Sequence, residues 1–255
     1  MNLGFIGSGE ITKAVVRGII NSKINYKKIY ISKRNIKISR NLKKESKKII
    51  ILSDNQKILN MSNWVFLAVT PDVGLKILKQ LKFKKSHTVI SFISTIKMAK
   101  LKELINLNKK KIVRAIPLPP IALGKGPVPI YPKNTKVKNF FNKIGECIEI
   151  NNEDVSLNFW ATSSLMASYY ELLSTTSKWL QKKGLAKELS EKYTTSLFNA
   201  LSEASFSKNV KDLDKLVKQS QTPKGLNEQT LKYLKKSGFY NELNFSLNKI
   251  LKRLK

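Results

Sequence analysis

Apolar residues in the first half of the chain alternate between two spacings. Leu3, Phe5 and Ile6 form a short run, and the apolar positions of the next segment, 10–20, then repeat every three or four residues. A short run is typical of a strand, whereas the longer repeat indicates a helix with one buried face. The same alternation continues to residue 116. Further strands are predicted at 28–32, 49–52, 64–69, 88–93 and 111–116, and helices at 73–81 and 98–107.

Strands that alternate with helices indicate a parallel sheet covered by helices on both faces. The segment 64–69, WVFLAV, is apolar throughout, as expected of a parallel strand that is buried on both sides. We therefore predict an α/β fold with an N-terminal Rossmann-type, doubly wound parallel sheet. Ligands of such sheets bind at the carboxyl ends of the strands.

The pattern changes after residue 116. A connection rich in proline and glycine, 117–133, contains one more predicted strand at 128–131, and a helix at 137–144 and a short run at 147–150 follow. From Glu153 onward only helical patterns remain, and they predict an all-α domain. The expected helices are 155–183, 186–206, 213–217, 225–236 and 240–254. We place the boundary between two domains, 1–152 and 153–255, at this residue.

The helical half carries more apolar side chains than one buried face can hold. In the segment 159–173, Trp160, Met166, Tyr169 and Tyr170 point to several faces of one predicted helix. A helix that is apolar all round is buried. We expect the all-α domain to bury these side chains in a homodimer or a higher homo-oligomer.

A glycine turn, Gly7-Ser8-Gly9, separates the first predicted strand from the first predicted helix. Such a turn lets the backbone approach a pyrophosphate, and the N–H groups and dipole of the following helix hold its charge. Thr12 occupies the third small position of the G-x-G-x-x-G pattern, where Gly or Ala is usual. The turn predicts a dinucleotide-binding domain at 1–152, although two glycines also occur in purely structural strand-to-helix connections.

The end of the second predicted strand bears on the choice of dinucleotide. An Asp or Glu at this place binds the ribose hydroxyls of NAD, but this chain has Ser32-Lys33-Arg34. A hydroxyl followed by two cations suits a 2′-phosphate. NADP(H) is therefore the expected cofactor, with NAD(H) possible, and the alternative is an ordinary loop with surface charges.

The net charge of +31 over 255 residues comes almost entirely from lysine. A basic balance of this size often indicates a nucleic-acid partner, but arginine is the favoured reader of bases and phosphates and is scarce here. The lysines are spread along the whole chain beside abundant Asn and Ile. We interpret them as solvated surface charge and expect no nucleic-acid partner.

Composition also bears on location and on metals. No apolar run approaches the roughly 20 residues of a membrane span, and the N-terminus lacks a signal-peptide pattern, so a cytoplasmic protein without membrane contact is expected. Cys147 is the single cysteine and His87 the single histidine. They offer poor support for a metal site or for thiol chemistry, and we expect no metal.

One helix start in the second half could bind an anion. Thr222 is a good N-cap and Pro223 a good first helical residue, so a helix is expected to begin here with free N–H groups. These groups could hold a substrate carboxylate. A capped helix start without a ligand is the alternative.

Over nearly its whole length the chain resembles the pyrroline-5-carboxylate reductase family. The resemblance rests on the order of several motifs, an all-helical second half and two late segments. The early motifs are GFIGSGE, ISKRN, VFLAVTPD, SFIST and the VRAIPLPP–GKGPVPIY connection, and the late segments are TPKGLNEQ and LKKSGFYNEL. Members of this family transfer hydride from NADPH or NADH to the C=N bond of a cyclic imino acid, making proline, and dimerise through C-terminal helices.

The resemblance implies site residues for this chain. The glycine turn would hold the cofactor phosphates, the ISKRN motif the 2′-phosphate, and a later asparagine the adenosine, with one further loop beside the cofactor. The implied cofactor-binding residues are Gly7, Ser8, Gly9, Glu10, Ile11, Ser32, Lys33, Arg34, Asn55, Ala68, Val69, Thr70 and Pro71. The implied substrate-binding residues, for a small carboxylated substrate, are Thr222, Lys224, Gly225, Leu226 and Asn227.

The departures from the family pattern fall near the expected chemistry. The family's Met-Pro-Asn-Thr-Pro aligns with 116–120, IPLPP, which loses both polar side chains. Its Gly-Ser-Gly-Pro-Ala helix entry aligns with 163–167. In its substrate loop, Ser-Pro-Gly-Gly-Thr-Thr, the second threonine becomes Asn227, to which we assign substrate orientation, and the first glycine becomes Lys224, which could add a positive charge.

These observations leave three hypotheses. The first is a reductase that transfers hydride from NADPH to a small cyclic imino acid, with pyrroline-5-carboxylate and hence proline biosynthesis as the expected case. The second is a related NAD(P)-dependent reductase of another small carboxylated imine or ketone. The third is a non-catalytic dinucleotide-binding protein. A cyclic imine is already protonated near neutral pH, so the first hypothesis needs no catalytic histidine.

Overall fold

The computed structural model describes residues 1–107, 111–207 and 212–255, which form two compact units. The first unit comprises Met1–Trp160 with Leu254–Lys255, and the second comprises Ala161–Arg253. The units divide within one helix, α7 (Glu153–Ser163), between Trp160 and Ala161, whereas the predicted domain boundary lies at the start of that helix.

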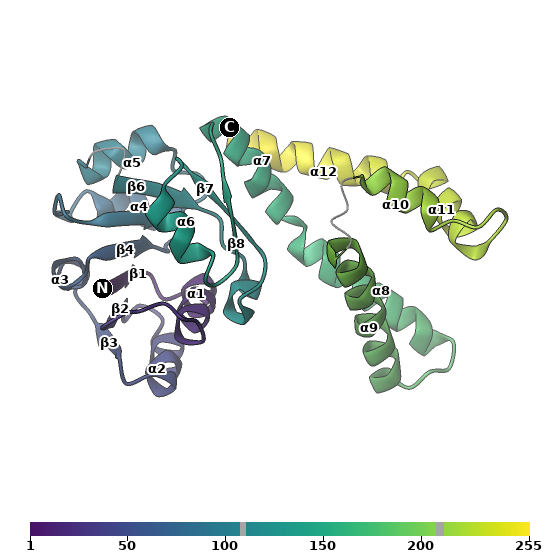
Figure 1. Cartoon of the computed structure of the whole chain (residues 1–255), viewed down its shortest axis with the longest axis horizontal. Helices are drawn as coiled ribbons and strands as arrows, with labels where there is room; N and C mark the ends of the chain where they lie inside the picture. Colours follow the sequence, from purple (N-terminus) through teal and green to yellow (C-terminus); the bar gives the residue numbers. More distant parts are fainter. Residues whose placement is uncertain (108–110, 208–211) are drawn as a thin grey trace. The chain divides into compact units, whose positions relative to one another are not determined.

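The first unit contains an eight-stranded sheet in the order β3-β2-β1-β4-β5-β6-β7-β8 (Figure 1). Every neighbouring pair is parallel except β6 and β7, which are antiparallel. The strands are β1 (Leu3–Ile6), β2 (Ile29–Ser32), β3 (Ile49–Leu52), β4 (Trp64–Leu67), β5 (Thr88–Ser91), β6 (Ile112–Ala115), β7 (Pro127–Tyr131) and β8 (Glu146–Glu149). The predicted Rossmann-type sheet is confirmed, with an antiparallel step at β7 that follows the proline-rich connection.

Helices cover both faces of this sheet, because alternate strand residues point into two separate apolar cores. Leu3 and Phe5 of β1 belong to the core on the first face. Ile6 of β1 and Val65 of β4 belong to the core on the opposite face. The first face is covered by α1 (Glu10–Ile20), α2 (Ile36–Glu45), α6 (Thr135–Phe141) and the 3₁₀ helix η2 (Pro119–Leu123). The second face is covered by α3 (Asn55–Met61), α4 (Pro71–Leu78) and α5 (Met98–Ile105).

Aromatic packing fixes the centre of the first core. The rings of Phe5 and Phe66 stack with their centroids 4.4 Å apart, and Phe140 of α6 packs 5.7 Å from Phe66. Burial of such rings is among the largest favourable contributions to a core. Phe5 and Phe66 lie opposite each other on β1 and β4, so the stack ties together the two strands at which the strand order reverses.

A glycine sets how closely α1 approaches the chain after β6. A Cβ on Gly18 would lie 2.5 Å from the carbonyl oxygen of Ile121 in η2. The third small residue of a dinucleotide fingerprint serves this purpose of close packing in other proteins. Here Thr12 instead stays fully buried and donates its hydroxyl to the carbonyl of Gly7 at 2.9 Å.

The second unit is entirely helical over its described residues. Its helices are α8 (Leu165–Lys182), α9 (Lys187–Ser207), α10 (Leu213–Gln219), α11 (Leu226–Lys236) and α12 (Phe239–Leu254), after the end of α7. The prediction of a single helix over 155–183 is wrong, because the helix is interrupted at Ser164. Its hydroxyl and its N–H both bond to the carbonyl of Ala161, which replaces the regular helical bond.

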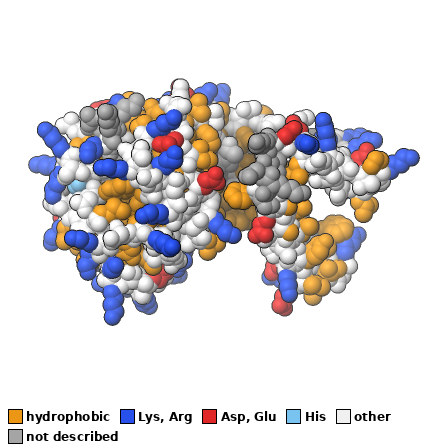
Figure 2. All heavy atoms as spheres, viewed as in Figure 1, with side chains coloured by type: hydrophobic (Ala, Val, Ile, Leu, Met, Phe, Trp, Pro, Cys, Tyr) orange, Lys and Arg blue, Asp and Glu red, His pale blue; other side chains and the backbone are white. Residues whose placement is uncertain are grey.

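The second unit lacks an apolar core of its own among the described residues. Both clusters of buried apolar side chains belong to the first unit, whereas Tyr170 and Trp179 of α8 are 53% and 57% exposed. Apolar side chains gather on the surface of the hairpin formed by α8 and α9 (Figure 2). An uncovered apolar surface of this kind is a feature of assembly interfaces. None of the helices described here is long and apolar enough to span a membrane.

His87 is a structural residue of the first unit. Its ring is completely buried just before β5; Nδ1 accepts from the backbone N–H of Lys84 at 3.1 Å, and Nε2 lies 3.1 Å from the carbonyl oxygen of Leu59. The geometry suits the neutral ring with its proton on Nε2. Burial lowers the pKa of His87, and the ammonium of Lys84 lowers it further, against the opposing effect of the bond to Leu59.

The buried histidine predicts a pH dependence of stability. Because its pKa is lowered on folding, the unfolded chain binds a proton first as the pH falls below about 6.5. The free energy of unfolding should therefore decrease between about pH 7 and pH 5. Denaturant titrations at several pH values measure this, and His87→Gln should flatten the slope. An unchanged slope in the variant would contradict the assignment.

Candidate functional site

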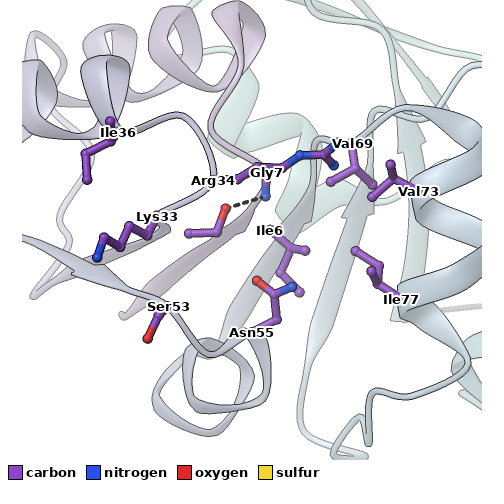
Figure 3. A pocket seen from close by; sticks show the side chains of 11 residues that line it. Ile6, Gly7, Lys33, Arg34, Ile36, Ser53, Asn55, Val69, Val73 and Ile77 are labelled. Atoms are coloured by element: carbon purple, nitrogen blue, oxygen red, sulfur yellow. Dashed lines mark hydrogen bonds between the residues drawn. The ribbon is translucent and has the colours of Figure 1, made fainter.

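A cavity of about 490 Å³ opens at the carboxyl ends of β1, β2 and β3, next to the switch in strand order between β1 and β4. This is the place where doubly wound sheets bind their ligands, and the volume is in the range of small-molecule sites. Figure 3 shows the residues around it. They are Ile6, Gly7, Ser32, Lys33, Arg34, Ile36, Ser53, Asn55, Val69, Val73 and Ile77.

The glycine turn forms the floor of this cavity. Gly7 has a φ of +108°, and a Cβ on it would lie 2.1 Å from the carbonyl oxygen of Ala68. No side chain fits that position, so only glycine allows the turn after β1 to contact the loop after β4. Val69, from the same loop, lines the cavity beside the apolar side chains of Val73 and Ile77 on α4.

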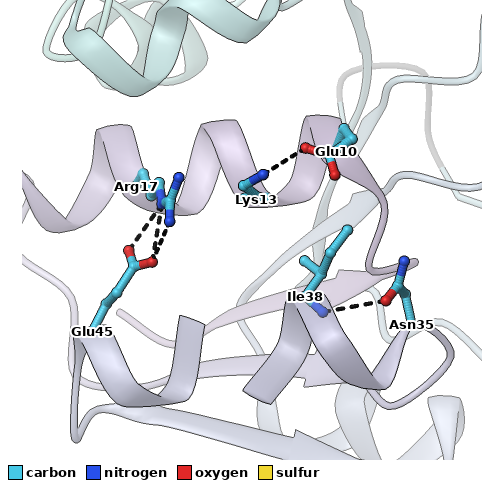
Figure 4. Close-up of polar contacts among 6 residues, drawn as sticks. All are labelled: Glu10, Lys13, Arg17, Asn35, Ile38 and Glu45. Atoms are coloured by element: carbon cyan, nitrogen blue, oxygen red, sulfur yellow. Dashed lines mark hydrogen bonds and ion pairs between the residues drawn. The ribbon is translucent and has the colours of Figure 1, made fainter. Parts of the chain in front are cut away.

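The start of α1 offers room and unsatisfied donors. Gly9 is the N-cap residue, so no side chain caps the first N–H groups of the helix, and a Cβ on Gly9 would have no other atom within 4 Å. Space and free N–H groups at a helix start are what a pyrophosphate requires. Glu10 turns its carboxylate to Lys13 at 2.8 Å (Figure 4), so its negative charge is paired.

Two serines fix the loops that surround this space. Ser32, predicted to contact a 2′-phosphate, accepts a hydrogen bond from the backbone N–H of Gly7 at 2.9 Å (Figure 3). Ser8 accepts from the N–H of Asn35 at 2.8 Å, and Asn35 in turn caps α2 by accepting from Ile38 (Figure 4). Both serines are buried. Their hydroxyls therefore join the glycine turn to the loop that carries the cations.

Lys33 and Arg34 are exposed cations on that loop, and neither pairs with a carboxylate in the described part of the chain. Other cations nearby do pair: Arg17 contacts Glu45 at 2.6 Å (Figure 4). In Figure 3 the side chain of Arg34 extends toward the side of the cavity formed by Gly7 and Val69. Two uncompensated cations at the end of β2 form a site for a dianion such as a phosphate.

Asn55 supplies a polar group that the protein leaves unpaired. It is the first residue of α3 and lines the cavity, and its Oδ1 is buried without a hydrogen-bond partner. A buried polar atom without a partner is rare in folded proteins, and a donor on a bound ligand would satisfy this one. Free N–H groups, two cations and an unpaired acceptor together fit an NADP-type dinucleotide.

Six of the thirteen predicted cofactor residues line the cavity, and the other seven lie in adjoining segments. Gly7, Ser32, Lys33, Arg34, Asn55 and Val69 line the cavity, while Ser8, Gly9, Glu10, Ile11, Ala68, Thr70 and Pro71 belong to the same loops and helix starts. Sequence reasoning missed Ile6, Ile36, Ser53, Val73 and Ile77. Ser53 follows β3 directly, so its position after a predicted strand could have identified it. Val73 and Ile77 are apolar residues of α4, and no sequence pattern distinguishes them from core residues.

The expected helix start at Thr222 is wrong. The chain makes a turn at 222–225, in which Gly225 donates to the carbonyl of Thr222 at 2.8 Å, and α11 begins at Leu226 with Gly225 as N-cap. Lys224 adopts a left-handed conformation with φ of +62°, which interrupts any helix. That conformation costs a non-glycine residue roughly 1 kcal/mol. Glu228 accepts a hydrogen bond from the N–H of Lys224 and stabilises the turn.

Asn227 has a structural partner within this segment. Its Nδ2 donates to the carbonyl of Ser220 at 2.9 Å, so its amide is oriented by the chain itself. Leu226 is 82% exposed. The roles assigned to Thr222, Lys224, Gly225, Leu226 and Asn227 in binding a substrate stay predictions.

Cys147 and the acidic residues give no sign of other chemistry. Burial raises the pKa of the Cys147 thiol to about 11, so it stays protonated near neutral pH. Over residues 1–107, 111–207 and 212–255, no group of His, Cys, Asp and Glu side chains is arranged to hold a metal ion. The expectation of a metal-free protein stays a prediction.

Comparison with known proteins agrees with this site. Residues 2–95 match the family model described as NADP oxidoreductase, coenzyme F420-dependent. Pyrroline-5-carboxylate reductase 3 of Danio rerio is 30% identical over 130 residues, which are 49% of this chain and 44% of that protein. Pyrroline-5-carboxylate reductase of Corynebacterium melassecola is 23% identical over 165 residues, 60% of each chain. The chain is thus matched over about half the length of these relatives.

The fold of the whole chain has a counterpart among solved structures. The crystal structure of Plasmodium falciparum pyrroline carboxylate reductase with NADP bound superimposes with a TM-score of 0.85 and 23% identity, covering 100% of this chain and 97% of that one. Fold, sequence relatives and motifs therefore agree. They confirm the predicted resemblance to pyrroline-5-carboxylate reductases and indicate an NAD(P)-dependent oxidoreductase.

Proposed function

We propose that this protein binds NADP(H) in the cavity after β1 and reduces the C=N bond of a small cyclic imino acid, in the first instance pyrroline-5-carboxylate to proline. The observation that carries the proposal is the pair of uncompensated cations, Lys33 and Arg34, beside the glycine turn. The names of the sequence relatives and the NADP in the Plasmodium falciparum structure support it.

Each group of the cavity has a role in this proposal. The N–H groups at the start of α1 bind the pyrophosphate over Gly9, the two cations bind the 2′-phosphate, and Asn55 accepts a hydrogen bond from the adenosine half. The bound nicotinamide supplies the hydride. The protein contributes position and exclusion of water.

The substrate carboxylate is assigned to the segment that contains the turn at 222–225. The uncapped N–H groups at the start of α11, the ammonium of Lys224 and the second N–H of the Asn227 amide are donors suited to an anion. A protonated cyclic imine needs no further proton before it accepts hydride. This agrees with the burial of the only histidine, His87, in a structural role.

Two other functions keep specific support. The segment 116–120 has no polar side chain where the family has two, and Asn227 replaces a threonine, which favours either another small carboxylated imine or ketone, or a protein that binds dinucleotide without turnover. Complementation of a proline auxotroph separates these functions. Growth supports pyrroline-5-carboxylate as substrate, and NADPH binding without growth points to the other two.

We also propose a homodimer or higher homo-oligomer that buries the exposed apolar side chains of α8 and α9. Leu189 and Tyr193 of α9 are each 55% exposed, in addition to Tyr170 and Trp179 of α8. We propose further that the protein acts in the cytoplasm without nucleic acid, membrane or metal.

Cofactor discrimination tests the roles of the two loop residues separately. Arg34→Ala removes a charge-assisted phosphate contact worth about 1.5–3 kcal/mol, so NADPH should bind about tenfold or more weakly while NADH is nearly unaffected. Ser32→Ala removes the tie to Gly7 and should weaken both cofactors alike. Titration calorimetry measures both. Equal losses of the two cofactors in Arg34→Ala would contradict the 2′-phosphate assignment.

A pair of substitutions at residue 224 tests the substrate site. Lys224→Ala and Lys224→Gly both remove the ammonium, and only glycine also relieves the left-handed conformation. If the ammonium binds the carboxylate, KM for the imino acid should rise about tenfold in both variants, with the Kd of NADPH unchanged. An unchanged KM in both variants would show that the ammonium of Lys224 does not bind the carboxylate. A rise of KM in the alanine variant alone would assign the effect to the left-handed backbone conformation of residue 224.

Sedimentation tests the assembly. Micromolar protein should have at least twice the 29.0 kDa mass of one chain. Tyr170→Asp on α8 should shift it toward the monomer, because a charge would be buried without a partner. Met61→Asp, at a 43% exposed residue of the first unit, is the matched control and should leave the mass unchanged. A wild-type monomer, or equal effects of both variants, would contradict the proposed interface.

A further inference from the structure

An ion pair between a buried arginine and a glutamate that is 19% exposed lies at the carboxyl ends of β5 and β6, outside the cavity described above. The side chain of Arg114 is 2% exposed, and its Nη1 donates to Oε1 of Glu153 at 2.6 Å. Its Nη2 donates to the carbonyl oxygen of Ser94 at 2.6 Å. The same Oε1 accepts from the backbone N–H of Met98, also at 2.6 Å.

This network joins three segments that are distant in sequence: the connection from β5 to α5, strand β6 and the start of α7. Ser94 lies in the loop after β5, Met98 begins α5, Arg114 belongs to β6 and Glu153 begins α7. All four residues belong to the first unit. One guanidinium and one carboxylate thus fix the backbone on the ligand side of two adjacent strands.

Packing alone does not explain the pair. Burying a guanidinium and a carboxylate costs free energy that their mutual attraction only partly recovers, and an apolar residue of similar volume often stabilises a core as well or better. The desolvation is strong enough to lower the pKa of Arg114. Its Nε is buried without a partner, which adds to the cost. Unlike an apolar residue, the pair fixes the direction of each hydrogen bond that it makes to the surrounding backbone.

We infer that Arg114 and Glu153 are positioning residues for the nicotinamide half of the bound cofactor. The inference rests on the proposed function. A dinucleotide whose pyrophosphate lies at the turn after β1 extends across the carboxyl ends of the strands beyond the switch point, toward β4 and β5. The loop of Ser94 follows β5 there, and the segment 116–120 follows Arg114 by two residues. Arg114 binds the loop of Ser94 directly. Arg114 also belongs to β6, the strand that leads into the segment 116–120.

The test compares whole NADPH with its adenine half. Glu153→Gln keeps the shape of the side chain and removes the charge, and Arg114→Lys keeps the charge but cannot donate to both Glu153 and Ser94 in the same geometry. Each variant is titrated with NADPH and with 2′,5′-ADP, which lacks the nicotinamide. The fluorescence anisotropy of bound NADPH reports how firmly the nicotinamide is held. Glu45→Gln, which breaks the exposed pair with Arg17, is the matched control.

Positioning predicts different effects on the two halves. Both variants should bind 2′,5′-ADP within about twofold of wild type, lose anisotropy of bound NADPH, and reduce imino acid with kcat lowered about tenfold to a hundredfold, the usual cost of misplacing a reacting group by an ångström. Glu45→Gln should change none of these.

Two outcomes would overturn the inference. One is unchanged anisotropy and kcat in a folded Glu153→Gln, and the other is an equal loss of NADPH and 2′,5′-ADP, which would assign the pair a purely structural role. If Arg114→Lys fails to fold, Glu153→Gln alone decides. A wild type that binds neither ligand would contradict the proposed function itself, and the inference with it.

Discussion

The contact between the turn after β1 and the loop after β4 depends on the absence of a side chain at Gly7. Any Cβ there would overlap the carbonyl of Ala68, and the strands could not approach closely enough to shape the floor of the cavity. Because Gly7 also donates its N–H to Ser32, the same residue sets the position of β2 and of the loop that follows it. The start of α1, the cations and Asn55 are arranged around this one backbone contact.

Much of this arrangement could be predicted from the sequence, because local patterns determine it. Short apolar runs and helical repeats predict parallel strands and helices, and the glycine turn and the residues at 32–34 follow their strands directly. Ser32 shows the limit of such reasoning. Its position was predicted correctly, but its hydroxyl binds Gly7, and a hydrogen bond between two loops cannot be derived from either loop alone.

The remaining features depend on tertiary contacts that leave little trace in a single sequence. Thr222-Pro223 has the composition of a helix start, yet Lys224 adopts a left-handed conformation that only its surroundings, including Glu228, can impose. Arg114 lies in an otherwise apolar strand, which is a signal, but its partner Glu153 is 39 residues away and could not be identified without the fold. The break at Ser164 is a different case, because the bonds there are local and join Ser164 to Ala161, three residues earlier, within a continuous helical pattern.

The two units differ in how far they bury their apolar side chains. The first unit buries its apolar residues in two cores against one sheet, whereas the second exposes large apolar side chains on most of its helices. The proposed oligomer would cover these exposed side chains. Substrate selection, assigned to residues of the second unit, would then depend on assembly as well as on the fold of one chain.

A crystal structure of the protein grown with NADP⁺ tests the central claim most directly. The account predicts the pyrophosphate against the N–H groups at the start of α1, over Gly9, and the 2′-phosphate within hydrogen-bond distance of Arg34. It also predicts a donor of the adenosine half on Oδ1 of Asn55, the acceptor that the free protein leaves unpaired. NADP⁺ bound at another place, or bound here with its 2′-phosphate directed into solvent away from Lys33 and Arg34, would contradict it.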